Sequence, residues 1–198
     1  MTTKNFTTLH VRDTIYSADS VEWCPIDPHL DIFACGTYYL VKGEEKDKQE
    51  RIGSILLFQI KKEELIQIDR VDLPAVLDMK WCPRRIKSQI LLGIANAIGE
   101  VSIFKFEENH LILLEKINLK KDEDETFLAL SLDWSKNESD NNICVSDSKG
   151  NITILKLTDA NGLLIISEWN AHSLEAWIVC FDAFNNDVVY SGNNQFFF

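Results

Sequence analysis

One short motif recurs four times along this sequence and constrains its fold more than any other feature. Each copy has an aromatic residue at its fourth position, and these aromatics are separated by 58, 53 and 47 residues. The copies are SVEWCP at 20–25, DMKWCP at 78–83, SLDWS at 131–135 and, less closely, IVCFD at 178–182. Repeats of about 40 to 50 residues are typical of solenoids and propellers. We therefore expect a repeat protein.

The segments between the copies predict three further strands in each repeat. A short apolar segment ending in small residues follows each copy, and a glycine with alternating apolar residues comes next. Glycine opens a turn, and a period of two indicates a strand. The segments in question are 33–36, 91–94, 143–146 and 188–191, then 53–58, 99–104 and 150–155, then 65–71, 111–119 and 163–169. Four short antiparallel strands form one propeller blade, and no segment has helical spacing.

The sequence thus predicts an all-β fold, an incomplete β-propeller of the WD-repeat type with about three and a half four-stranded blades. The expected blades of this single unit, 1–198, are 18–73, 75–119, 128–170 and the start of a fourth at 175–192. Large aromatics at a fixed repeat position fill the space between blades, so Trp23, Trp81 and Trp134 are expected to be buried. Residues 7–16 are expected to form an extra strand, and 42–51 and 120–125 to form solvated loops.

Composition restricts the partners and the compartment. The chain is 45% apolar and 26% charged, as globular proteins are, and its net charge of -11 argues against binding to nucleic acid. No apolar run has the length of a membrane span or of a signal-peptide core. The five cysteines stand singly in apolar segments, which predicts reduced core residues rather than disulfides or a zinc site. We expect a soluble, cytoplasmic protein with no nucleic acid, membrane, cofactor or metal partner.

Six blocks of sequence, in order, resemble the diphthine methyl ester hydrolase family, the WD-repeat proteins of diphthamide biosynthesis. The blocks are ADSVEWCP at 18–25, ACGTY at 34–38, AVLDMKWC at 75–82, LALSLDWS at 128–135, AHSLEAWI at 171–178 and VYSG at 189–192. Together they cover nearly the whole chain. The resemblance implies an esterase that removes the methyl ester from methylated diphthine on translation elongation factor 2.

The end of the chain departs from that family, whose members continue for several more blades. Here the sequence stops at SGNNQFFF, where acidic residues and a strand ending in Trp-Asp are expected. The last two strands of the fourth blade are therefore expected to be absent, which indicates a truncated product. An unfinished blade leaves an unpaired apolar edge, to which Phe196–Phe198 would contribute.

Catalytic candidates come from the start of each inner strand, because these starts converge at one mouth of a propeller channel. The residue three positions before each repeat aromatic is polar in three of the four repeats: Ser20, Asp78 and Ser131. His172, in the loop before the fourth inner strand, is a candidate general base near neutral pH, with Glu175 to orient it. The alternatives are that His172 hydrogen-bonds neighbouring strands, and that the three polar residues cap turns.

Two further residues fit the substrate that the resemblance implies. Diphthine carries a trimethylammonium group, which an aromatic face beside carboxylates binds by cation–π and charge attraction. Trp177, next to Glu175, and Asp19 are therefore candidate substrate-binding residues. Neither a G-x-S-x-G elbow nor an H-E-x-x-H motif is present, so the residues alone do not identify the nucleophile.

Three functions remain open on the sequence. The first is the esterase, the second is a non-catalytic WD-repeat scaffold, and the third is an inactive truncated fragment of the esterase. The family blocks favour the first over the second, because a generic scaffold has no reason to contain them together.

Overall fold

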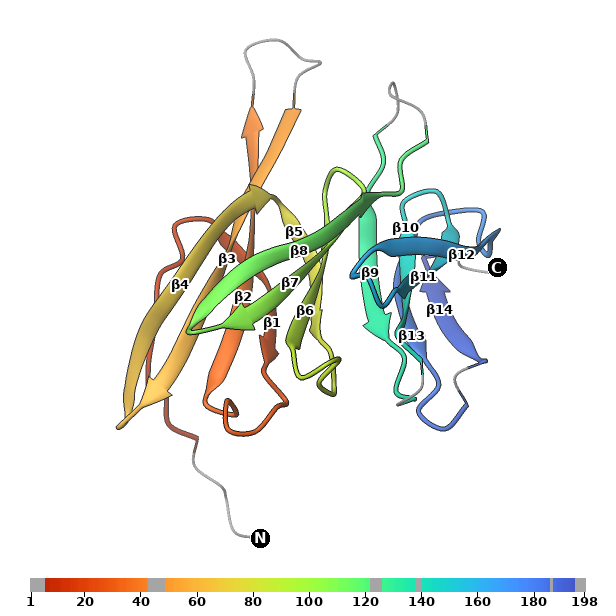
Figure 1. Cartoon of the computed structure of the whole chain (residues 1–198). Helices are drawn as coiled ribbons and strands as arrows, with labels where there is room; N and C mark the ends of the chain where they lie inside the picture. Colours follow the sequence, from red (N-terminus) through yellow and green to blue (C-terminus); the bar gives the residue numbers. More distant parts are fainter. Residues whose placement is uncertain (1–5, 43–48, 122–125, 138–139, 186, 195–198) are drawn as a thin grey trace, which may run out of the picture.

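The structure, a computed structural model, describes residues 6–42, 49–121, 126–137, 140–185 and 187–194. The regular secondary structure of these residues consists of fourteen strands and no helix, and the strands form four antiparallel sheets (Figure 1). The first three sheets are β1 (Ser17–Trp23), β2 (Ile32–Lys42), β3 (Gln49–Lys61) and β4 (Glu64–Pro74); β5 (Val76–Trp81), β6 (Ile90–Asn96), β7 (Glu100–Glu107) and β8 (His110–Asn118); and β9 (Ala129–Trp134), β10 (Asn142–Asp147), β11 (Asn151–Leu157) and β12 (Leu163–Asn170). The fourth sheet has two strands, β13 (Ala176–Phe181) and β14 (Val189–Asn193).

Each sheet is a simple meander, and its first strand faces the first strand of the next sheet. β1 contacts β5, β5 contacts β9, and β9 contacts β13, so these four inner strands form one continuous row. The sheets follow one another as blades of an open arc (Figure 1). The predicted all-β architecture with four-stranded blades is therefore confirmed, and the propeller is not closed. The described part of the chain contains no helix long and apolar enough to cross a membrane.

The cores lie between the blades. Residues of β2 and β3 pack against β5 and β6 in one cluster that contains Ile55, Met79 and Trp81, and a second cluster with Leu132 and Trp134 joins the next two blades. A smaller third cluster joins β10 and β11 to Val179 and Phe181. Trp81, Trp134 and Phe181 thus each pack on the blade before their own, where they remove apolar surface from water.

The indole groups also repeat one hydrogen bond across the blade boundaries. Trp81 donates its Nε1–H to the carbonyl of Glu22 at 3.1 Å, and Trp134 donates its own to the carbonyl of Lys80 at 2.9 Å. Both acceptors are the residue directly before the repeat aromatic of the preceding blade. The recurrent tryptophan therefore sets the register of one inner strand against the next.

Two predictions of burial were wrong. Trp23 is 49% exposed, against 5% for Trp81 and 1% for Trp134, because no described blade packs on that face of the first sheet. Its ring contacts Phe33 of its own sheet, with the centroids 4.9 Å apart. Cys180 is also exposed, whereas the other four cysteines are buried and all five are free.

The extra strand expected at 7–16 is not formed. Residues 6–16 are irregular and mostly exposed, and the first strand begins at Ser17. A strand needs a partner strand to pair with, and none of the described strands pairs with this segment. The loop expected at 42–51 is shorter than predicted, because Lys42 pairs with Gln49 at the end of the β2–β3 hairpin. Residues 43–48 and 122–125, and the terminal Phe196–Phe198, lie outside the described residues.

Two equivalent turns show how the sequence specifies the blades. Gly99 and Gly150 have φ of +76° and +80°, a region that residues with a Cβ rarely adopt. Asn96 and Asp147, three residues earlier, accept backbone N–H groups from across the turn at 2.7–3.1 Å. A Cβ on Gly150 would lie 2.1 Å from the carbonyl oxygen of His172, so the same glycine allows the next blade to approach.

Candidate functional site

A cavity of about 450 Å³ opens along the inner strands of the second, third and fourth blades. Its walls come from β5, β9 and β13 and from the residue that follows β9 by two positions. The lining residues are Asp78, Lys80, Ser131, Asp133, Lys136, Ile178, Val179 and Cys180. Five of them are charged or carry a hydroxyl group, and four of these five lie on β5 and β9, strands whose other positions are mostly buried.

Asp78 and Ser131, both predicted from the sequence, are in direct contact. Ser131 donates its hydroxyl to Asp78 Oδ2 at 2.8 Å, and the backbone N–H of Leu132 donates to the same oxygen at 3.1 Å. Asp78 Oδ1 accepts the N–H of Met79 at 2.9 Å, which fixes the carboxylate at the start of β5. A serine hydroxyl on a positioned carboxylate is an arrangement in which the carboxylate can take the proton of a nucleophile.

Lys80 supplies a positive charge beside this pair. Its ammonium is bonded to Glu22 of the first blade. Burial works to lower the pKa of Lys80, but the hydrogen bond to Glu22 and the charges of Asp78 and Asp133 outweigh it, so the pKa is raised. Lys80 is therefore positively charged at neutral pH, and it is suited to stabilise a developing oxyanion rather than to act as a base.

Asp133 joins the third blade to the fourth. Its Oδ2 accepts the backbone N–H of Phe181 at 3.0 Å and lies 3.8 Å from the ammonium of Lys136. Burial raises the pKa of Asp133, while the hydrogen bond from Phe181 and the charges of Lys136 and Lys80 act against that shift. The row Glu22, Lys80 and Asp133 thus alternates in charge along the inner strands.

His172 lies apart from these contacts. Its Nε2 is 2.8 Å from the hydroxyl of Ser191 on β14, and its backbone N–H donates to the carbonyl of Gly150 at 3.0 Å. Gly150 lies in the turn after β10, and the last residue of β10 pairs with the first residue of β9. His172 therefore lies at the end of the blades where the inner strands begin. It does not line the cavity. The geometry favours the hydrogen-bonding alternative for this histidine.

The other predicted residues are dispersed around the start of the inner strands. Ser20 is half-buried on β1 and pairs with Gly36 across the sheet. Burial raises the pKa of the Asp19 carboxyl, and the charge of Asp78 adds to the shift, so these two carboxylates are within electrostatic reach. Glu175 and Trp177 are exposed at the start of β13, where Trp177 directly precedes Ile178 of the cavity wall.

Lys80 and Asp133 were missed by the sequence reasoning, although a signal for them was present. Counting back three residues from each repeat aromatic finds Asp78 and Ser131, and counting back one finds Glu22, Lys80 and Asp133. Charges at a fixed position of strands that are otherwise apolar indicate a shared polar surface. Within the described residues, no group of three or more His, Cys, Asp or Glu is arranged to hold a metal ion.

Comparison with known proteins identifies the relatives of this chain. "Diphthine methyltransferase" of Mus musculus is 36% identical over 94% of the chain and 43% of its own length, and that of Homo sapiens is 33% identical over 94% and 47%. The chain is a partial-length homologue of proteins named diphthine methyltransferase. The "Diphthine methyltransferase homolog" of Dictyostelium discoideum is 32% identical over 91% of the chain and 52% of its own length.

The chain therefore spans about half the length of the curated diphthine methyltransferases that it matches. No protein-family model matches it. Among solved structures, the crystal structure of Saccharomyces cerevisiae Sqt1, a WD-repeat protein, aligns with a TM-score of 0.58 and 9% identity. That alignment covers 84% of this chain and 39% of Sqt1, and it supports a β-propeller-type fold.

Proposed function

We propose that this chain is part of a diphthine methyl ester hydrolase, which removes the methyl ester from methylated diphthine on translation elongation factor 2. The proposal rests on the six family blocks and on homologues named for diphthine chemistry. The name of those homologues describes the transfer of a methyl group, whereas the reaction proposed here releases one as methanol. The observation that carries the reaction type is the serine–carboxylate pair beside an ammonium group in the channel cavity.

In the proposed reaction, the Ser131 hydroxyl oxygen attacks the carbonyl carbon of the methyl ester while Asp78 accepts its proton. The bond from Oγ to carbon forms, the bond from carbon to the methoxy oxygen breaks, and methanol leaves with the proton. Water then hydrolyses the acyl-serine and regenerates the hydroxyl. Lys80, held charged by Glu22, stabilises the negative oxygen that forms in both steps.

The exposed aromatic and acidic residues nearby suit the cationic part of the substrate. The Trp177 side chain is 49% exposed, and Asp19 and Glu175 contribute negative charge at the same end of the inner strands. A trimethylammonium over an indole is worth about 0.5 to 2 kcal/mol, depending on how far it is desolvated. Trp177→Leu is therefore expected to raise KM by up to about 30-fold, while kcat changes little.

The experiment uses a longer protein that contains this chain, with elongation factor 2 carrying methylated diphthine as the substrate. Ser131→Ala is compared with Ser102→Ala, because Ser102 is a buried serine that also donates to a carboxylate, Glu100 at 2.9 Å, but does not line the cavity. Both variants lose one serine–carboxylate hydrogen bond, so they are expected to lose similar stability. Only Ser131→Ala should abolish methanol release per folded molecule.

Two results would count against the proposal. Equal turnover by the two folded variants would remove Ser131 from the chemistry. Incorporation of a labelled methyl group from S-adenosylmethionine into the factor, with no methanol released, would assign the protein to methyl transfer, as the name of its homologues describes.

A further inference from the structure

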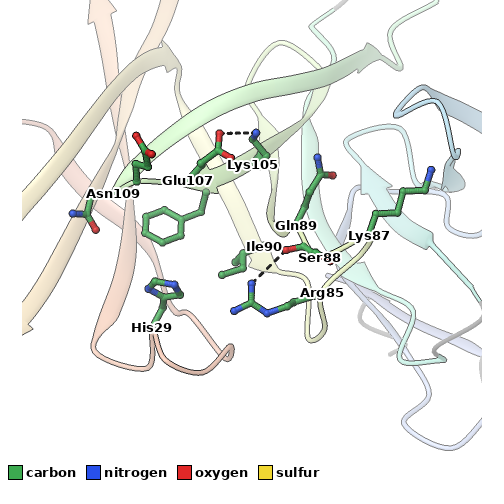
Figure 2. Close-up of a pocket in the computed structure, with 11 residues that line it drawn as sticks. His29, Arg85, Lys87, Ser88, Gln89, Ile90, Lys105, Glu107 and Asn109 are labelled. Carbon is green, nitrogen blue, oxygen red and sulfur yellow. Dashed lines mark hydrogen bonds and ion pairs between the residues drawn. The ribbon is translucent and has the colours of Figure 1, made fainter.

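A second pocket, of about 390 Å³, lies beyond the opposite ends of the inner strands, between the first and second blades (Figure 2). Three segments form it: the loop after β1, the connection from β5 to β6, and the β7–β8 hairpin. Figure 2 shows His29 on one side of the pocket, Arg85 and Ser88 below it, and Lys105 and Glu107 above it. The pocket is separate from the cavity that contains Asp78 and Ser131.

The connection from β5 to β6 is basic and is held rigidly on both sides. Its sequence, CPRRIK at 82–87, carries three cations in a chain whose net charge is -11. Arg84 donates to the carbonyls of Ser135, at 2.7 Å, and of Asp140 in the third blade. Arg85 donates to the carbonyl of Asp27 in the first blade at 3.0 Å. The loop is therefore preorganised before any ligand arrives.

Among the residues that the structure describes, no carboxylate forms an ion pair with Arg85. The hydrogen bonds of its guanidinium go to the carbonyls of Asp27 and Ser88. Lys105, in contrast, is paired with Glu107 at 2.7 Å. An arginine fork matches the two oxygens of a carboxylate, and a guanidinium held in place loses less side-chain entropy on binding.

The side chains around Arg85 determine which kind of ligand can carry the bound anion. The His29 ring stands edge-on to Phe106, with the centroids 5.2 Å apart, and forms a flat wall. Glu107 and Glu108 add negative charge at the hairpin, so a ligand with a dense run of anions is repelled. The pocket suits a single carboxylate on a largely neutral chain.

We propose that this pocket binds a peptide segment of a partner protein that carries a single acidic side chain, with Arg85 as the anchor for its carboxylate. A nucleic acid fits less well, because phosphate backbones require several unneutralised cations along a surface and the surrounding charge is negative. Inorganic phosphate shares the anionic chemistry but not the peptide backbone. The inference is independent of the proposed ester hydrolysis.

The test measures binding of a short peptide to the whole chain, immobilised at low density so that chains cannot associate with one another. The probe is acetyl-Gly-Gly-Glu-Gly-Gly-amide, and the matched peptide carries Gln in place of Glu. The Glu peptide is expected to bind at least fivefold more tightly than the Gln peptide, and this comparison uses the unaltered protein. Arg85→Met, which keeps the apolar stem, should remove the difference, and Arg85→Lys should restore part of it.

Arg70→Met is the control, because Arg70 is a partly exposed arginine that pairs with Asp72 on a different surface. It should leave peptide binding unchanged. Equal binding of the two peptides, an unchanged preference in Arg85→Met, competition by inorganic phosphate at the concentration of the peptide, or tighter binding of an oligonucleotide would each overturn the assignment.

Discussion

The repeat tryptophans allow one substitution to be tested at three equivalent positions that differ in burial. Trp134 and Trp81 each donate an indole N–H to the preceding inner strand and are nearly inaccessible, whereas Trp23 is half exposed. Replacing a buried tryptophan by phenylalanine removes one hydrogen bond, worth about 0.5 to 1.5 kcal/mol. It also removes buried apolar contacts worth about another 1 to 2 kcal/mol. Trp134→Phe and Trp81→Phe should therefore each lower the free energy of unfolding by about 2 to 3 kcal/mol.

Trp23→Phe should cost less than about 0.5 kcal/mol, the usual effect of a surface substitution. The assay is urea denaturation followed by far-UV circular dichroism, at a concentration where ultracentrifugation shows a monomer. With a slope of about 2 kcal/mol per molar urea, the two buried variants shift the midpoint by about 1 M, a difference that is easily resolved. A midpoint for Trp23→Phe that falls as far as the others would refute the reasoning, because it would mean that the first blade is covered in solution.

Three further predictions concern contacts between and within the blades. His172→Ala, measured in a longer protein containing this chain, should lower the free energy of unfolding by about 1 to 3 kcal/mol through loss of the hydrogen bond to Ser191. Turnover per folded molecule should be nearly unchanged. A drop of about 10²- to 10⁴-fold in turnover would instead make His172 the general base. Because the pKa of Lys80 is raised on folding, the stability it contributes is present at neutral pH and is lost only as the pH rises above its unfolded value of 10.5. Urea midpoints measured from neutral to alkaline pH should therefore fall less steeply in Lys80→Gln than in the unaltered protein. Parallel curves would contradict this. Gly150→Ala should lower the free energy of unfolding by about 2 to 4 kcal/mol, because the residue has a positive φ and its Cβ would contact the carbonyl of His172. The measurement is the melting temperature. An unchanged melting temperature would contradict this prediction and show that the turn and the next blade relax.

Much of the fold could be predicted from local patterns. The alternation of apolar residues, the turn glycines Gly99 and Gly150, and the recurrence of one aromatic position specify four-stranded meanders and their order. These features are local, because a period of two decides which side chains share a strand face and a glycine permits the turn between two strands. The candidate residues Asp78 and Ser131 were found in the same way, since equivalent positions of a repeat converge in space.

Other properties depend on which blade, if any, lies against a given face, and the local pattern does not contain that information. Trp23 has the same sequence surroundings as Trp81, yet it is exposed because its blade has a neighbour on one side only. The local pattern likewise did not show that Cys180 is exposed on the cavity wall or that residues 7–16 form no strand. The tertiary structure alone paired Lys80 with Glu22 and the Asp78 carboxylate with the Ser131 hydroxyl, because each of these contacts joins residues more than fifty positions apart on different blades.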